Sequence, residues 1–167
     1  QVQGLQGATI FTTIVDSPNN FGVVEMDENG AVLSLEEKPV IAKSKNIATG
    51  LYFYQNSVVD IAKGIRPSAR GELEITDINI EYLKQKKLVA QQLGRGFAWL
   101  DTGTQESLLQ ASNFIETIQH RQGLMVACLE EIAFTNKWIN EKKLVEISQK
   151  YKNSPYGSYL INLLQSP

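Results

Sequence analysis

The chain has 167 residues, of which 43% are hydrophobic, and a formal net charge of −2. This size suits one compact domain, alone or with a small helical appendage, and the balanced charge argues against nucleic acid as a partner. A single cysteine and a single histidine exclude an internal disulfide and a structural zinc site. The sequence has no apolar run of membrane length and no secretory signal, so we expect a cytoplasmic protein without a membrane anchor.

Segments rich in β-branched and aromatic residues occupy much of the first hundred positions and predict strands. Asn29 and Gly30 lie between two of these segments and predict a hairpin, because both residues tolerate positive φ. The predicted strands span residues 7–15, 21–27, 31–38, 46–54 and 87–93.

Apolar residues at helical spacing predict six helices. The helix predicted from Gly71 has an acidic first turn, which suits the helix dipole. Thr104 and Asn140 are placed to cap two later helices. The predicted helices span residues 57–65, 71–84, 104–120, 129–137, 141–151 and 156–164.

Strands alternate with helices as far as Asp101, and only helices follow. This order predicts a mixed α/β body at residues 1–103 and a helical C-terminal segment at residues 104–167.

Charged residues gather at the end of the second hairpin strand, where Glu36, Glu37 and Lys38 precede Pro39. Carboxylates accept hydrogen bonds from vicinal hydroxyls, and a lysine supplies a point charge for phosphate, so this motif fits a polyhydroxyl ligand with an anionic group. The alternative is a solvated edge with an ordinary ion pair. Gly22 lies inside a predicted strand. It either lets a ligand approach the backbone closely or marks a β-bulge.

Three further positions have an ordinary structural explanation beside a functional one. Tyr52, near Ala48, is either a ligand contact or a half-buried strand aromatic. Asp101 is placed to meet a metal ion or a polar ligand, or is a turn former before a helix capped by Thr104. His120 is either a base or, most simply, a favourable charge at a helix C-terminus.

Six motifs taken together resemble the sugar nucleotidyltransferases, specifically the glucose-1-phosphate thymidylyltransferases. The resemblance runs from about Gly7 to the C-terminus and implies a Rossmann-like nucleotide-diphospho-sugar transferase fold. The family's glycine-rich nucleotide loop and Gly-Asp-Asn metal motif are absent, so the chain resembles the C-terminal portion without the nucleotide-binding half. In order, the motifs are FGVVE (21–25), LEEKP (35–39), TGLYFY (49–54), RGELEITD (70–77), GRGFAWLDTGT (94–104) and ASNFIETI (111–118).

The resemblance implies transfer of a thymidylyl group from dTTP to glucose 1-phosphate, giving dTDP-glucose and pyrophosphate. It implies that Glu37 holds sugar hydroxyls, that Lys38 contacts the phosphate and that Asp101 binds Mg²⁺ with a second aspartate from the missing half. Lys38 and Asp101 are the implied catalytic residues. The implied substrate-binding residues are Gly22, Glu37, Lys38, Ala48, Tyr52 and Trp99.

The resemblance also implies a homotetramer of the dTDP-rhamnose pathway with a regulatory nucleotide-sugar site. Arg95, Val126 and Glu131 match that site. Thr135 stands where the family has an arginine that can pair with phosphate, which argues against feedback inhibition by dTDP-rhamnose. We expect the fragment alone to be inactive, with dTTP bound only when the other half is present. The alternative function is a non-catalytic sugar-phosphate-binding or oligomerisation module.

Overall fold

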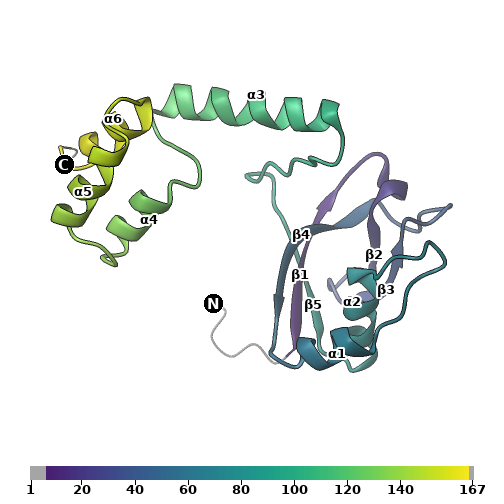
Figure 1. Cartoon of the computed structure of the whole chain (residues 1–167). Helices are drawn as coiled ribbons and strands as arrows, with labels where there is room; N and C mark the ends of the chain where they lie inside the picture. Colours follow the sequence, from purple (N-terminus) through teal and green to yellow (C-terminus); the bar gives the residue numbers. More distant parts are fainter. Residues whose placement is uncertain (1–6, 166–167) are drawn as a thin grey trace. The chain divides into compact units, whose positions relative to one another are not determined.

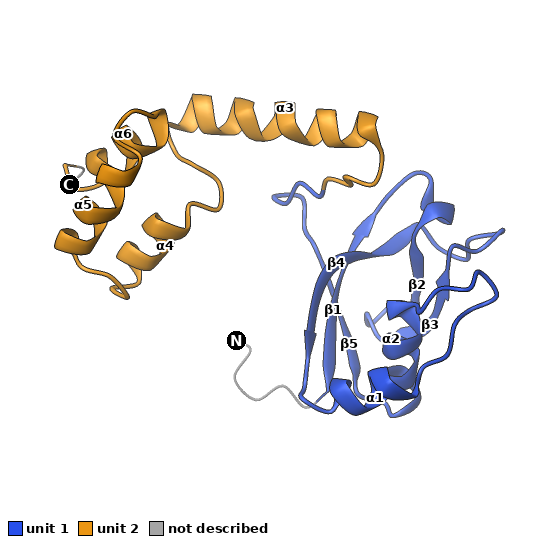
Figure 2. Ribbon diagram, in the orientation of Figure 1, with its two compact units in different colours: residues 1–99 blue, residues 100–167 orange. Residues whose placement is uncertain are grey.

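The computed structural model describes residues 7–165 and divides the chain into two compact units (Figure 2). Unit 1 ends at Trp99, and unit 2 begins at Leu100. Unit 1 combines a sheet with helices, whereas unit 2 is helical (Figure 1). The predicted α/β class, with helices following the sheet, is therefore confirmed. In the described part of the chain, no helix is both long and apolar enough to cross a membrane.

A five-stranded mixed sheet forms the centre of unit 1, with strand order β3-β2-β4-β1-β5. Strands β1 and β5 run parallel, and the other neighbouring strands run antiparallel. Each predicted strand forms, and none is shorter by more than one residue at either end. The strands are β1 Ala8–Ile14, β2 Gly22–Met26, β3 Val32–Glu37, β4 Asn46–Tyr54 and β5 Leu88–Gln92.

Two helices of unit 1, α1 (Val58–Gly64) and α2 (Ile75–Lys84), pack on the sheet. Side chains at alternate positions of β1 face α2, because strand side chains point to opposite faces in turn. Ile80 and Leu83 of α2 contact the core of the sheet. The buried residues of this core are Ala8, Ile10, Val24, Leu35, Ile78 and Tyr82.

The predicted hairpin joins β2 and β3, but its turn differs from the expected one. Gly30 has a φ of 81°, whereas Asn29 is not among the residues with positive φ. Asp27 closes the loop instead, since its side chain accepts from the backbone N–H groups of Asn29 and Ala31 at 2.9 and 2.8 Å. Only one residue therefore needs the left-handed conformation.

The helix predicted from Gly71 begins later, at Ile75, so the predicted start is wrong. Gly71 has a φ of 77°, which is incompatible with a right-handed helix. Ser68 closes a turn over this segment, because its backbone N–H donates to the carbonyl of Glu72 at 2.8 Å. The displaced segment is a loop that carries Arg70 and Glu74, both of which contribute to the site described below.

Unit 2 consists of four helices within the described residues: α3 (Gln105–Gln122), α4 (Leu129–Thr135), α5 (Glu141–Lys150) and α6 (Pro155–Asn162). Helices α4 to α6 share a small core at Cys128, Leu144 and Leu160. Thr104 caps α3 by accepting from the backbone N–H of Ser107 at 3.1 Å. Asn140 caps α5 in the same way, accepting from Lys143 at 2.9 Å. Both predicted caps are confirmed.

Candidate functional site

The register of the β2–β3 hairpin brings two predicted site residues face to face. Gly22, the first residue of β2, pairs with Glu37, the last residue of β3. A Cβ atom on Gly22 would lie 3.2 Å from Oε2 of Glu37 and 3.1 Å from Oγ1 of Thr76. The register shift of this hairpin lies at Glu25 and Met26, so Gly22 is not at a bulge. The glycine instead gives the Glu37 and Thr76 side chains room over the backbone.

Glu37 is held by residues that precede and open α2. Oγ1 of Thr76 donates to Oε2 of Glu37 at 2.5 Å. On the other side, Nη1 of Arg70 lies 3.9 Å from Oε1 of Glu37. A half-buried carboxylate in this arrangement has one oxygen committed to a hydroxyl and the other beside a positive charge.

Arg70 connects Glu37 to the loop before α2. Its guanidinium contacts Glu72 at 2.8 Å and Glu74 at 3.3 Å, and Glu74 is buried. Ser68 donates a further hydrogen bond to Glu74 at 2.9 Å. Arg70 thus places one positive charge among three carboxyl groups, one of which is buried.

Tyr52 of β4 completes this group from the neighbouring strand. Burial raises the pKa of the Tyr52 phenol, and the negative charge of Glu37 raises it further. The half-buried ring packs on the cluster formed by Ile10, Val24 and Leu35. Ala48, in the same strand, lies next to Gly22, with its Cβ 3.9 Å from where a Cβ on that glycine would be.

The backbone of β4 is irregular around Gly50, two residues after Ala48. Residues Thr49, Gly50 and Leu51 stand opposite Phe11 alone, because the register with β1 shifts between Ile10 and Thr12. A bulge of this kind bends the strand and redirects its side chains. A bulge therefore lies in β4 around Gly50, and not at Gly22.

Lys38 follows Glu37 in a strained conformation. Its φ is 45°, in the left-handed region that non-glycine residues rarely occupy. Its backbone N–H donates to the carbonyl of Phe21 at 3.0 Å, which fixes the residue beside the start of β2. The side chain is exposed. A lysine held in this way is available for an anionic ligand.

Trp99 reaches the same strand start through an aromatic contact. Its ring meets Phe21 edge to face, with centroids 5.4 Å apart and planes at 80°. It also lines an apolar hollow of about 480 Å³ together with Phe11, Leu51 and Phe97. Unit 1 thus brings Gly22, Glu37, Ala48 and Tyr52 together. Lys38 follows Glu37 in the chain, and Trp99 contacts Phe21, the residue before Gly22.

Of the remaining predicted residues, one belongs to unit 1 and three belong to unit 2. Asp101 belongs to unit 2, where its Oδ1 accepts from the backbone N–H of Gly103 at 3.3 Å. Arg95 of unit 1 lines a separate hollow beyond the end of β5. In unit 2, the backbone N–H of Val126 donates to Gln119 at 2.9 Å, and Glu131 accepts from the hydroxyl of Tyr159 at 2.6 Å.

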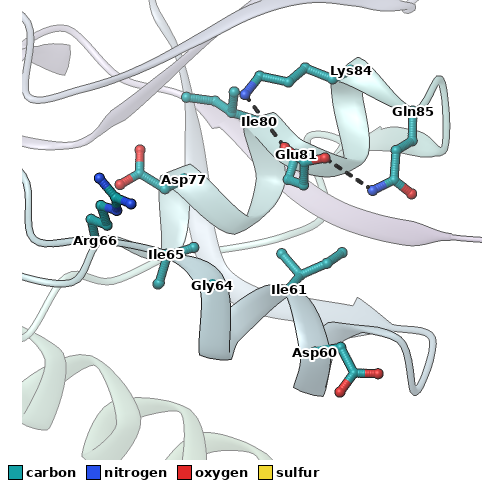
Figure 3. A pocket seen from close by; sticks show the side chains of 10 residues that line it. All are labelled: Asp60, Ile61, Gly64, Ile65, Arg66, Asp77, Ile80, Glu81, Lys84 and Gln85. Atoms are coloured by element: carbon teal, nitrogen blue, oxygen red, sulfur yellow. Dashed lines mark hydrogen bonds and ion pairs between the residues drawn. The ribbon is translucent and has the colours of Figure 1, made fainter.

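A hollow of about 580 Å³ between α1 and α2 contains none of the predicted site residues (Figure 3). Ile61, Ile65 and Ile80 form its apolar part. Glu81 at its rim is engaged by Lys84 and Gln85 of the same helix, at 3.4 and 3.2 Å (Figure 3). Asp60, Arg66 and Asp77 supply the other charged groups that line this hollow.

Comparison with protein families gives a match to the nucleotidyl transferases over residues 2–118. The chain belongs to the nucleotidyl transferase family. This nucleotidyl transferase is 53% identical over 159 residues to a glucose-1-phosphate thymidylyltransferase of Neisseria meningitidis serogroup A, an alignment covering 95% of the chain. The same alignment covers 55% of the relative, so the chain spans about half the length of the relative it matches.

Two solved structures are similar to this nucleotidyl transferase. A Bacillus anthracis protein described as a glucose-1-phosphate thymidylyltransferase, in complex with sucrose, matches with a TM-score of 0.58 and 42% identity. That match covers 65% of this chain and 43% of the other. A UDP-glucose pyrophosphorylase complexed with UDP-glucose matches with a TM-score of 0.60 over 70% of this chain and 46% of the other. Its identity of 24% supports the fold alone.

Sequence patterns do not reveal Thr76 and Arg70 as parts of this site, because they predict a plain helix start in the segment that contains both residues. A usable signal was present, since Gly71 interrupts the helical pattern and three charged residues surround it. Such a charged loop before a helix is a candidate for polar contacts to a neighbouring strand end.

Proposed function

We propose that this chain is the C-terminal, sugar-phosphate-binding portion of a glucose-1-phosphate thymidylyltransferase. The observation that carries the proposal is the group in unit 1 where Gly22, Glu37, Ala48 and Tyr52 meet at one end of the β2–β3 hairpin. Its polar groups suit a polyhydroxyl ligand, and Lys38 beside them suits a phosphate.

In this proposal each residue has a distinct task. Glu37 accepts hydrogen bonds from sugar hydroxyls while Thr76 keeps the carboxylate oriented. The backbone at Gly22 and Ala48 contacts the sugar, and Tyr52 forms a wall of the pocket. Lys38 neutralises the phosphate of glucose 1-phosphate. Trp99, in contact with Phe21, borders the same strand end.

The reaction proposed for the whole protein is attack of the glucose 1-phosphate phosphate on the α-phosphate of dTTP. A phosphate oxygen forms the new P–O bond, and the bond to pyrophosphate breaks. Such a transfer needs positioning and charge neutralisation more than a covalent nucleophile. This chain supplies the acceptor side, and dTTP binding falls to residues outside it.

We propose that this chain supplies only part of a Mg²⁺ site. Among residues 7–165, no group of three or more histidine, cysteine, aspartate or glutamate side chains could hold a metal ion. Asp101 alone does not make a Mg²⁺ site, because this ion keeps its waters unless several carboxylates or phosphates replace them. We propose Asp101 as one ligand of an ion completed by groups outside this chain.

The proposal extends to regulation and assembly. Arg95, Val126 and Glu131 are retained as effector contacts, but Thr135 lacks the positive charge that would pair with a nucleotide-sugar phosphate. We therefore propose that dTDP-rhamnose does not inhibit this protein. A cytoplasmic homotetramer of the dTDP-rhamnose pathway follows from the same proposal.

The test is titration of the chain with glucose 1-phosphate by calorimetry, with Lys38→Ala and the exposed Lys63→Ala as a matched pair. Saturable binding that Lys38→Ala weakens and Lys63→Ala leaves intact supports the proposal. An absence of binding by the unmodified chain overturns it. A parallel assay with dTTP and Mg²⁺ is expected to give no pyrophosphate, and turnover would contradict the inactivity proposed for this portion.

A further inference from the structure

Three tyrosine rings form a stack that runs from Tyr52, beside Glu37, into the core of unit 1. The rings of Tyr52 and Tyr54, both on β4, lie 6.0 Å apart with planes at 12°. Tyr54 in turn stacks on Tyr82 of α2 at 5.7 Å and 21°. Tyr52 is thus the member of the stack nearest the proposed ligand, and Tyr54 is its support.

The inner end of the stack is fixed by buried polar contacts. The Tyr54 hydroxyl donates to Oδ1 of Asn79 at 2.6 Å, and Asn79 is 0% exposed. The hydroxyl of the fully buried Tyr82 lies 3.0 Å from Oγ of Ser57. Burial of the ring is the main cause that raises the pKa of Tyr54, so its phenol remains a neutral donor at physiological pH.

The outer end of the stack is held differently. Within residues 7–165, the Tyr52 hydroxyl forms no hydrogen bond to another protein group, so packing alone fixes its ring. A side chain held by packing moves when its support moves. The position of the Tyr52 ring therefore depends on the position of Tyr54.

Helix α2 connects both walls of the pocket. Thr76 holds Glu37, and Asn79, three residues later, holds Tyr54. Residues three apart lie on the same face of a helix. One rigid element therefore sets the carboxylate and the aromatic wall together.

We infer that Tyr54 and Asn79 are positioning residues that set the Tyr52 ring for sugar-phosphate binding. This inference rests on the proposed function, because it requires Tyr52 to face the ligand. Neither Tyr54 nor Asn79 touches the ligand in this arrangement. They affect ligand binding by positioning the Tyr52 ring that stacks on Tyr54.

The experiment measures the affinity of the chain for glucose 1-phosphate by calorimetry in a double-mutant cycle of Tyr52→Leu, which removes the outer ring, and Tyr54→Phe. Tyr54→Phe keeps the ring and loses only the hydrogen bond to Asn79. Since a net hydrogen bond is modest, we expect about threefold to tenfold weaker binding. We expect a smaller effect in the Tyr52→Leu background, because the ring that Tyr54 positions is then missing and coupled residues are not additive.

Ser34→Ala is the matched control, because it removes a hydroxyl that donates to Glu25, also at 2.6 Å in unit 1. It is expected to bind glucose 1-phosphate normally. Asn79→Leu provides a second variant that removes the acceptor of the Tyr54 hydroxyl, and a thermal melt checks that each variant is folded.

Unchanged affinity of a folded Tyr54→Phe variant, or an identical loss with and without the Tyr52 ring, would overturn this inference alone. Absence of binding by the unmodified chain would instead overturn the proposed function together with it.

Discussion

Thr76 and Glu37 are 39 positions apart in sequence, yet the threonine hydroxyl donates to the glutamate carboxylate at 2.5 Å. The contact joins the start of α2 to the end of β3 and passes over Gly22. A carboxylate that would otherwise rotate freely at a strand end is thereby given one orientation.

Replacing Gly22 by alanine is expected to displace the Thr76–Glu37 pair. The new methyl group would lie 3.1 and 3.2 Å from two oxygens that are already locked together. We expect a loss of about 1–3 kcal/mol in the free energy of unfolding, the usual cost of overpacking, and weaker glucose 1-phosphate binding. Urea denaturation measures the first effect. Gly50→Ala is the control, since no atom lies within 4 Å of its added Cβ; equal losses in both variants would contradict the prediction.

Replacing Lys38 by glycine is expected to separate stability from binding. A φ of 45° costs a residue with a Cβ about 1 kcal/mol or more, and glycine avoids that cost. Lys38→Gly should therefore unfold at higher urea concentration than Lys38→Ala. Both variants should lose affinity for glucose 1-phosphate, because both lack the ammonium group. If the two variants were equally stable, the strain would not be real.

Alkaline pH is expected to destabilise unit 2 through Tyr156 and Tyr159. Burial, and then hydrogen bonds to Cys128 and Glu130 for Tyr156 and to Glu131 for Tyr159, raise both pKa values above the ordinary 10.0. The folded state thus favours the neutral phenols. Their contribution is complete below pH 10 and is lost as the pH rises above it, because the unfolded chain ionises first.

Urea unfolding curves between pH 8 and 11 measure this dependence. Tyr159→Phe should flatten it, whereas Tyr151→Phe, at a tyrosine that is 43% exposed, should leave it unchanged. A pH dependence of the same slope in both variants would show that the α6 tyrosines are not its source.

Leu144→Ala is expected to unfold the small core of unit 2. Leu144 is 0% exposed and packs with Cys128 and Leu160, and such a cavity costs about 2–5 kcal/mol. Hydrogen exchange should show lost protection in α4 to α6 while the strands of unit 1 keep theirs. Val145→Ala, one position further and 37% exposed, is the control. Loss of protection in the β1–β4 pair would mean that the units do not unfold independently.

Sequence patterns predicted the elements of this protein well, because the forces that make them act over a few residues. Alternation in β1 and β4, the caps at Thr104 and Asn140, and the hairpin at Gly30 all depend on neighbours in the chain. The predicted start of α2 is wrong for the same reason. The turn closed by Ser68 overrides the helical pattern that begins at Gly71.

The order of strands and helices, and the motifs that carry the family resemblance, can be read from the amino-acid sequence alone. Tertiary structure decided how the site is built: that Gly22 makes room for Glu37, that Thr76 and Arg70 belong beside it, and that Tyr52 rests on Tyr54. These contacts join a strand end, a loop and a helix face. Their formation depends on how α2 packs against the sheet, and periodicity within a single segment carries no information about that packing.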